Sequence, residues 1–89
     1  MNDDTLKLFL SGEVRVVFRK KTNNLIRSLL GTLNKDDIPP EHYSTLPKAI
    51  DVFMSDKAVI WDMEYNDWRS FYWSTVIDIL QTEQKKEIQ

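Results

Sequence analysis

A stretch between residues 12 and 33 most constrains how this chain folds. Val14, Val16 and Phe18 alternate with Arg15, Val17 and Arg19, which is the period-two pattern of a strand with one buried face. Asn23 and Asn24 follow a basic run, and a short amide side chain tolerates the positive φ angles that a tight turn requires. The chain then returns through a second apolar run. The pattern predicts a β-hairpin over 13–33.

Gly31 lies inside the predicted return strand, where a missing side chain more often marks a bulge or a sharp bend than a flat ladder. A bent hairpin is the usual opening of a small barrel. The residues 57–73 predict a second hairpin across a polar turn, and 75–80 predict a last short strand. We therefore expect a mainly β fold whose two antiparallel ribbons curl into a closed body.

The remaining segments predict short helices around these strands. Acidic residues begin a helix at about 3–11. Prolines interrupt the connection 34–56, in which we expect a short helix over 47–54, with a strand over 49–53 as the competing interpretation. We expect a single domain over 1–80, followed by a polar tail over 81–89 that is either frayed or helical.

Composition narrows the class of protein. The 89 residues contain no cysteine, which excludes disulfides, thiolate zinc sites and a thiol nucleophile. No run approaches the roughly 20 apolar residues of a membrane span, so we expect a soluble intracellular protein. Residues 1–48 carry eight basic against six acidic side chains, and 49–89 carry four against eight, which gives the net charge of −2. We therefore expect no strong non-specific binding to duplex DNA.

Several motifs together resemble one known family. The pattern is Gly-x-Val-x-Val-x-Phe-x-Lys from Gly12, then Gly-Thr-Leu-Asn from Gly31, a proline-rich gap, Trp61-Asp and Trp-Arg-Ser-Phe from Trp68. It resembles the small bacteriophage proteins that are related to WYL domains and form Sm-like barrels of the SH3 type. The resemblance covers about residues 5–80. It implies a phage origin, the cytoplasm of the infected host, a five-stranded bent SH3/Sm-like barrel, and binding or edge-to-edge association rather than a known activity.

An aromatic and basic face is the first candidate site. Rings beside basic groups suit the bases and phosphates of single-stranded nucleic acid. Strand alternation places Trp68 and Tyr72 on one side and Phe71 on the other, so we expect at least one large ring to reach the surface. The alternative is that Trp61 and Phe71 fill the core and the lysines are solvated. The predicted binding residues are Arg15, Arg19, Lys20, Lys21, Trp68, Tyr72 and Trp73, with Arg27 and Tyr65 on the same face.

A second candidate site consists of Arg27, Asp62 and Arg69. If the strands pair as in an Sm-like barrel, these three residues meet at one mouth of the barrel. A carboxylate between two guanidinium groups either fixes the sheet register or holds a small anion such as a nucleotide. The structural role is the favoured reading of this cluster, and the sequence has no glycine-rich phosphate loop.

Catalytic and metal sites receive little support. His42, with the acidic residues Asp36, Asp37 and Glu41, is the weak candidate for a metal site, and we predict no metal and no cofactor. No second histidine exists to build a nucleophile–base pair, so we do not expect an enzyme.

The sequence therefore predicts a protein that works by binding. The leading hypothesis is a phage accessory protein, dimeric or larger, that binds a host macromolecule, either single-stranded RNA or a host protein that it inhibits. The first alternative is a module that captures a nucleotide-like anion at the barrel mouth. The second is an inhibitor of a host nucleic-acid enzyme that acts through the acidic second half of the chain. That half carries Asp51, Asp56, Asp62, Glu64, Asp67 and Asp78.

Overall fold

Strands and short helices alternate along the chain in the computed structural model, which describes residues 3–81. The predicted helix at the N-terminus, both hairpins and the last strand are confirmed. The predicted tail lies outside the described residues except for Gln81, which belongs to the last strand. The elements are α1 (Asp3–Ser11), β1 (Val14–Arg19), β2 (Ile26–Thr32), η1 (Lys35–Asp37), η2 (Pro40–Thr45), α2 (Leu46–Val52), β3 (Lys57–Asp62), β4 (Asp67–Tyr72), η3 (Trp73–Thr75) and β5 (Val76–Gln81).

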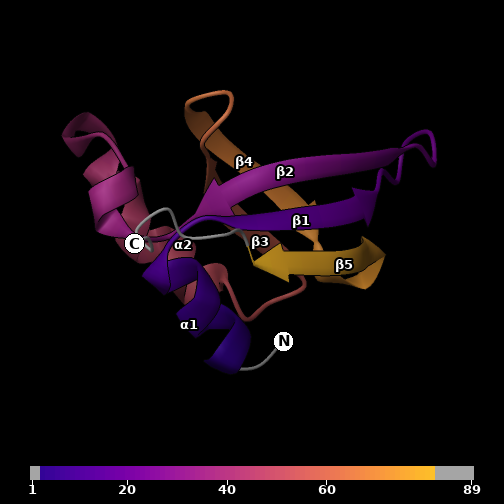
Figure 1. Ribbon diagram of the computed structural model, residues 1–89, viewed down its shortest axis with the longest axis horizontal. Coiled ribbons are helices and arrows are strands. Elements are labelled where there is room, and N and C mark those ends of the chain that lie inside the picture. Colours follow the sequence, from indigo (N-terminus) through magenta and orange to yellow (C-terminus); the bar gives the residue numbers. More distant parts are fainter. Residues whose placement is uncertain (1–2, 82–89) are drawn as a thin grey trace, which may run out of the picture.

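The five strands form one antiparallel sheet in the order β4-β3-β2-β1-β5 (Figure 1). The fold is mainly β, as predicted, but the expected closed body is wrong. Within residues 3–81 no ladder joins β4 to β5, and the short 3-10 helix η3 connects them instead. β4 and β5 are therefore both open edges. No helix in this part of the chain is long and apolar enough to cross a membrane.

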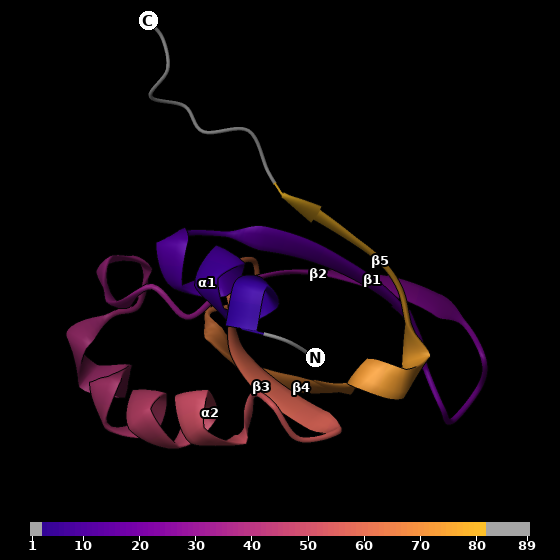
Figure 2. The same cartoon turned by 90° about the horizontal axis from the view of Figure 1, so that it is seen from below.

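Strand β2 gives the sheet its bend. Its first six residues pair with β1, whereas only Gly31 and Thr32 pair with β3. The β3–β4 hairpin consequently folds across the concave side of the strands β1, β2 and β5 (Figure 2). Of the bulge or sharp bend expected at Gly31, the bulge is absent from the continuous β1–β2 register, while the change of partner from β1 to β3 falls at this residue. The register shift lies between Val17 and Phe18, where β1 pairs with β5.

The core fills the space inside this bend. Phe9 of α1 and Phe53, which follows α2, contact each other and Trp73 in edge-to-face pairs with centroids 5.0 to 6.4 Å apart. Aromatic pairs of this geometry add to the stabilisation that comes from burial. The remaining buried members of the cluster are Val14, Val16, Leu29, Leu33, Ala49, Ala58, Ile60 and Phe71.

The central connection contains the predicted short helix, α2, with Pro47 in its first turn, where a missing N–H costs nothing. The competing strand over 49–53 is wrong. Ala49 is buried and Phe53 directly follows the helix, so both reach the core from the helical conformation. Figure 2 shows α2 beside the β3–β4 hairpin, at the opposite end from the β1–β2 turn.

The turn of the first hairpin depends on Asn24, which has the predicted positive φ, 65°. Replacing Asn24 with alanine should lower the free energy of unfolding by about 1 kcal/mol, because an ordinary side chain is disfavoured in the left-handed region. Replacing it with glycine should leave stability equal or slightly higher. Urea unfolding of the three proteins measures the difference, and an alanine variant as stable as the parent would contradict this role.

Candidate binding site

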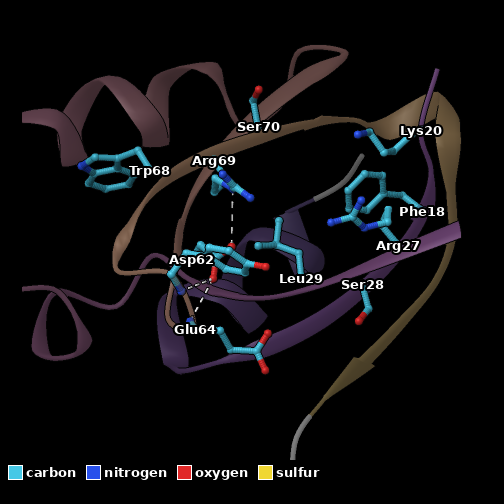
Figure 3. A pocket seen from close by; sticks show the side chains of 11 residues that line it. Phe18, Lys20, Arg27, Ser28, Leu29, Asp62, Glu64, Trp68, Arg69 and Ser70 are labelled. Carbon is cyan, nitrogen blue, oxygen red and sulfur yellow. Dashed lines mark hydrogen bonds and ion pairs between the residues drawn. The ribbon is translucent and has the colours of Figure 1, made fainter. Parts of the chain in front are cut away.

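A cavity of about 520 Å³ lies between the two hairpins, at the end of the concave face that the core leaves open. Volumes of this size are typical of ligand pockets. Phe18 and Leu29 contribute apolar side chains from β1 and β2, and Arg27 and Arg69 extend toward the same space from β2 and β4 (Figure 3). The other lining residues are Lys20, Ser28, Asp62, Glu64, Tyr65, Trp68 and Ser70.

Asp62 is the buried anchor of this cavity, with 2% of its surface exposed. Its Oδ1 accepts hydrogen bonds from the backbone N–H groups of Glu64 and Tyr65, at 2.9 and 3.0 Å. Its Oδ2 lies 3.6 Å from Nε of Arg69. A carboxylate that accepts neighbouring N–H groups organises the turn that follows it, so Asp62 fixes the β3–β4 turn and the direction of Arg69 together.

The two arginines of the predicted cluster do reach one cavity, but they play different parts. Arg69 is held by Asp62 and lies over the ring of Tyr65, with 4.7 Å between the guanidinium carbon and the ring centroid. The guanidinium of Arg27 forms no hydrogen bond or ion pair with any residue between 3 and 81. The expected carboxylate between two guanidinium groups is therefore not formed, because Asp62 pairs with Arg69 alone in this part of the chain. The guanidinium of Arg69 is therefore held in place, whereas that of Arg27 has no partner among the described residues.

Glu64 lies at the rim of the cavity, where it forms an ion pair with Arg15. Arg15 donates to both of its carboxylate oxygens, at 3.4 and 3.2 Å, and to the hydroxyl of Ser28 at 3.4 Å. Arg15, which we predicted as a binding residue, thus crosses the outer side of β2 and links β1 to Ser28 and Glu64. Arg15 pairs with Glu64 and Arg69 pairs with Asp62, so the cations of the cavity that have no acidic partner among residues 3–81 are Lys20 and Arg27.

The basic tip of the first hairpin lies beside a smaller hollow of about 170 Å³, which reaches from the tip to β4. Lys20 lines both this hollow and the main cavity. Nζ of Lys21 lies 4.0 Å from the ring centroid of Tyr72, and Arg19 donates to the carbonyl of Asn24 at 3.1 Å. The predicted residues Arg19, Lys20, Lys21 and Tyr72 therefore gather at one place, but Lys21 already covers a face of the Tyr72 ring.

Trp73 is not part of a binding face, and this prediction is wrong. Only 9% of its surface is exposed, and its indole N–H donates to the carbonyl of Phe53 at 2.7 Å. The alternation along β4 correctly separates Phe71 from Trp68 and Tyr72, but the buried side is the one that carries Phe71 and Trp73. Trp68 is half-buried against Trp61, with ring centroids 5.4 Å apart.

His42 serves as a packing residue. Its ring lies against Trp61, with 4.7 Å between centroids, on the face of β3 opposite the main core. Trp61 is buried, as the core interpretation of the sequence expected.

Sequence reasoning missed the apolar floor of the cavity, whereas it included Tyr65, the exposed ring at the rim, in the aromatic and basic face. Phe18 stacks on Phe71, with centroids 5.9 Å apart, and so closes the cavity toward the core. Tyr65 has 63% of its surface exposed, in a turn where Asn66 has a φ of 56°. A turn signal was present in Asp62 and Asn66, but only the fold places that turn opposite Arg27.

Comparison with protein-family models, curated proteins and solved structures found no match to this chain. The resemblance to phage WYL-related proteins stays a hypothesis that rests on the motifs alone.

Proposed function

We propose that this protein is a non-enzymatic binding protein that captures an anionic group of its partner in the cavity between the two hairpins. The observation that carries the proposal is the pair of arginines on facing strands. Arg69 is oriented by Asp62 and Tyr65, and Arg27 has no partner in the described part of the chain. A guanidinium group offers several N–H donors in a planar fork that matches a carboxylate or a phosphate.

The cavity favours an anion over a stacked nucleic-acid strand. Stacking needs an aromatic face that is open to a base. Lys21 lies over Tyr72, Trp68 packs on Trp61, and Trp73 is buried. Tyr65 is well exposed but carries Arg69 on its ring. Single-stranded RNA is therefore the weaker of the macromolecular hypotheses. A host protein, as the resemblance to phage proteins implies, remains the stronger one.

Calorimetric titration with inorganic pyrophosphate, and with a nucleoside diphosphate, tests the proposal. We expect Arg27→Ala and Arg69→Ala each to weaken binding by about tenfold or more, which corresponds to about 1.4 kcal/mol or more. Lys48→Ala provides the matched control, because Lys48 is exposed on α2 and does not line the cavity, and it should bind like the parent.

Two results would contradict anion capture at this site. One is equal affinity of all four proteins for pyrophosphate. The other is the absence of any binding to the parent, accompanied by tight binding of an eight-nucleotide oligouridylate that Lys20→Ala/Lys21→Ala abolishes. The second result would favour RNA binding by the hairpin tip instead.

A further inference from the structure

The wall of the cavity includes an edge of β2 that pairs with no other strand in the described part of the chain. β2 pairs with β1 from Ile26 to Gly31, but with β3 only at Gly31 and Thr32. One further bond, from the N–H of Met63 to the carbonyl of Leu30 at 2.8 Å, ends the contact with the second hairpin. Among residues 3–81, therefore, no strand pairs with residues 26–29 on the side that faces the β3–β4 turn.

The phase of the β1–β2 ladder shows which backbone groups this edge presents. The N–H of Lys20 donates to the carbonyl of Leu25 at 2.8 Å, and hydrogen-bonded pairs recur every second residue along an antiparallel ladder. Arg27 and Leu29 therefore bond to β1, whereas the backbone groups of Ile26 and Ser28 point away from it. The bond from Met63 to Leu30 lies on this same outward side, which agrees with the phase.

Ser28 is a residue of this free edge that also lines the cavity. It lines the cavity, yet its hydroxyl points away from the space between Arg27 and Arg69 in Figure 3. Across the cavity, backbone groups of β4 also point away from the neighbouring strand, although the N–H of Trp68 donates to Oδ1 of Asp67 at 2.8 Å. The N–H of Trp73 donates to the carbonyl of Asp56 at 2.7 Å, so Trp68 and Ser70 direct their backbone groups away from β3, and both line the cavity.

We propose that the partner is an acidic segment of polypeptide that enters the cavity in an extended conformation and adds a strand to the free edge of β2. An extended peptide carries N–H and C=O groups at the spacing that such an edge offers, and strand addition is a recurrent mode of peptide recognition. This inference rests on the proposed capture of an anion at Arg27 and Arg69, and it names the chemistry of the partner.

The faces of β2 define the sequence pattern of that segment. Arg27 lies on the concave face and Ile26 on the convex face, where 57% of its surface is exposed. An added strand alternates in the same way, so acidic side chains at every second position meet Arg27, Arg69 and Lys20. The residues between them lie beside Ile26. The matching pattern is acidic, apolar, acidic.

Fluorescence anisotropy with a labelled synthetic octapeptide of alternating glutamate and valine tests the proposal on the full chain. Replacing the glutamates with glutamine should weaken binding at least tenfold. N-methylation of alternate residues, made in both possible phases, should weaken binding at least tenfold in at least one phase, because it removes the N–H groups that β2 would receive. If both methylated peptides bind as tightly as the parent peptide, charge alone attracts it and strand addition is overturned.

A protein variant separates this inference from the proposed function. Ser28→Pro removes the outward N–H without removing a bond to β1, and proline is accepted at a free strand edge. It should weaken peptide binding at least ten times more than it weakens pyrophosphate binding. Ser28→Ala keeps the N–H and should show no such difference between the two ligands. Circular dichroism checks the fold, and the methylated peptides decide the question if the proline variant does not fold.

The outcomes are distinguishable. If pyrophosphate binds through Arg27 and Arg69 but the peptide does not bind, strand addition fails and the anion site stands. If neither binds, both fail. Oligouridylate that binds at the same arginines more tightly than the peptide, and displaces it, would overturn the acidic polypeptide as partner in favour of nucleic acid. Concentration-dependent self-association that excludes the peptide would overturn it in favour of a second copy of this chain.

Discussion

Replacing Asp62 with alanine is expected to lower the free energy of unfolding by about 3 kcal/mol, because hydrogen bonds to a charged group contribute about 1.5–3 kcal/mol each. The Asp62 carboxylate accepts two backbone N–H groups of the β3–β4 turn and also pairs with Nε of Arg69. The ion pair itself should contribute little of this loss, because Arg69 is largely exposed and solvent screens it. Urea unfolding followed by tryptophan fluorescence measures the change.

Two matched variants identify the cause of that loss. Asp62→Asn keeps an oxygen that can accept from the turn but removes the charge, so it should cost about half as much as alanine. Asp67→Ala removes the exposed carboxylate directly opposite in the β3–β4 ladder, whose Oδ1 accepts from the N–H of the adjacent Trp68 at 2.8 Å. It should lower stability by about 1 kcal/mol at most, clearly less than Asp62→Ala. An alanine variant at residue 62 that is as stable as the one at 67 would show that Asp62 does not organise the turn.

Local patterns explain most of what the sequence predicted correctly. Alternation over 14–19 defines β1 whatever the rest of the chain does, because period two fits only an extended strand with one buried face. Asn24 and Pro47 act within a few residues of themselves, at the hairpin turn and at the start of α2. The elements and their order follow from such short-range signals.

The sequence did not show whether the two ends of the sheet meet, because this depends on residues far apart in the chain. Whether the sheet closes depends on the distance between β4 and β5, which are the two ends of the strand order. The 3-10 helix η3 spans that corner, and its Trp73 is anchored in the core through its indole N–H. A closed ladder and an open one carry the same alternation, so periodicity does not distinguish between them.

The candidate site was predictable as a set of residues but not as an arrangement. Strand register placed Arg27, Asp62 and Arg69 on the concave side of the bend, and the cavity contains all three. Their pairing depends on the β3–β4 turn, which draws Asp62 toward its own backbone and Arg69 and leaves Arg27 without a partner in residues 3–81. Alternation along β4 likewise separated its two faces without showing which face is buried. For this reason Trp73, which shares the buried face with Phe71, was wrongly counted among the binding residues.

Gly31 has a steric role, and replacing it with alanine is expected to lower the free energy of unfolding by about 2 kcal/mol, as overpacking of a core does. A Cβ atom at this position would lie 2.1 Å from Cδ1 of Ile60 and 2.8 Å from its Cγ1. Ile60 is fully buried, so its side chain has little room to move aside. Gly31 is also the residue at which β2 pairs with both β1 and β3, so a backbone shift there would disturb two ladders.

A double-mutant cycle separates this clash from the conformational freedom of glycine. Ile60→Val removes Cδ1 and by itself should cost about 1 kcal/mol. Combined with Gly31→Ala, it should cost clearly less than the sum of the two single changes, because the nearest clashing atom is gone. Gly31 has no positive φ, so alanine meets no backbone penalty that would persist in the double variant. Strictly additive losses in urea unfolding would contradict the steric explanation.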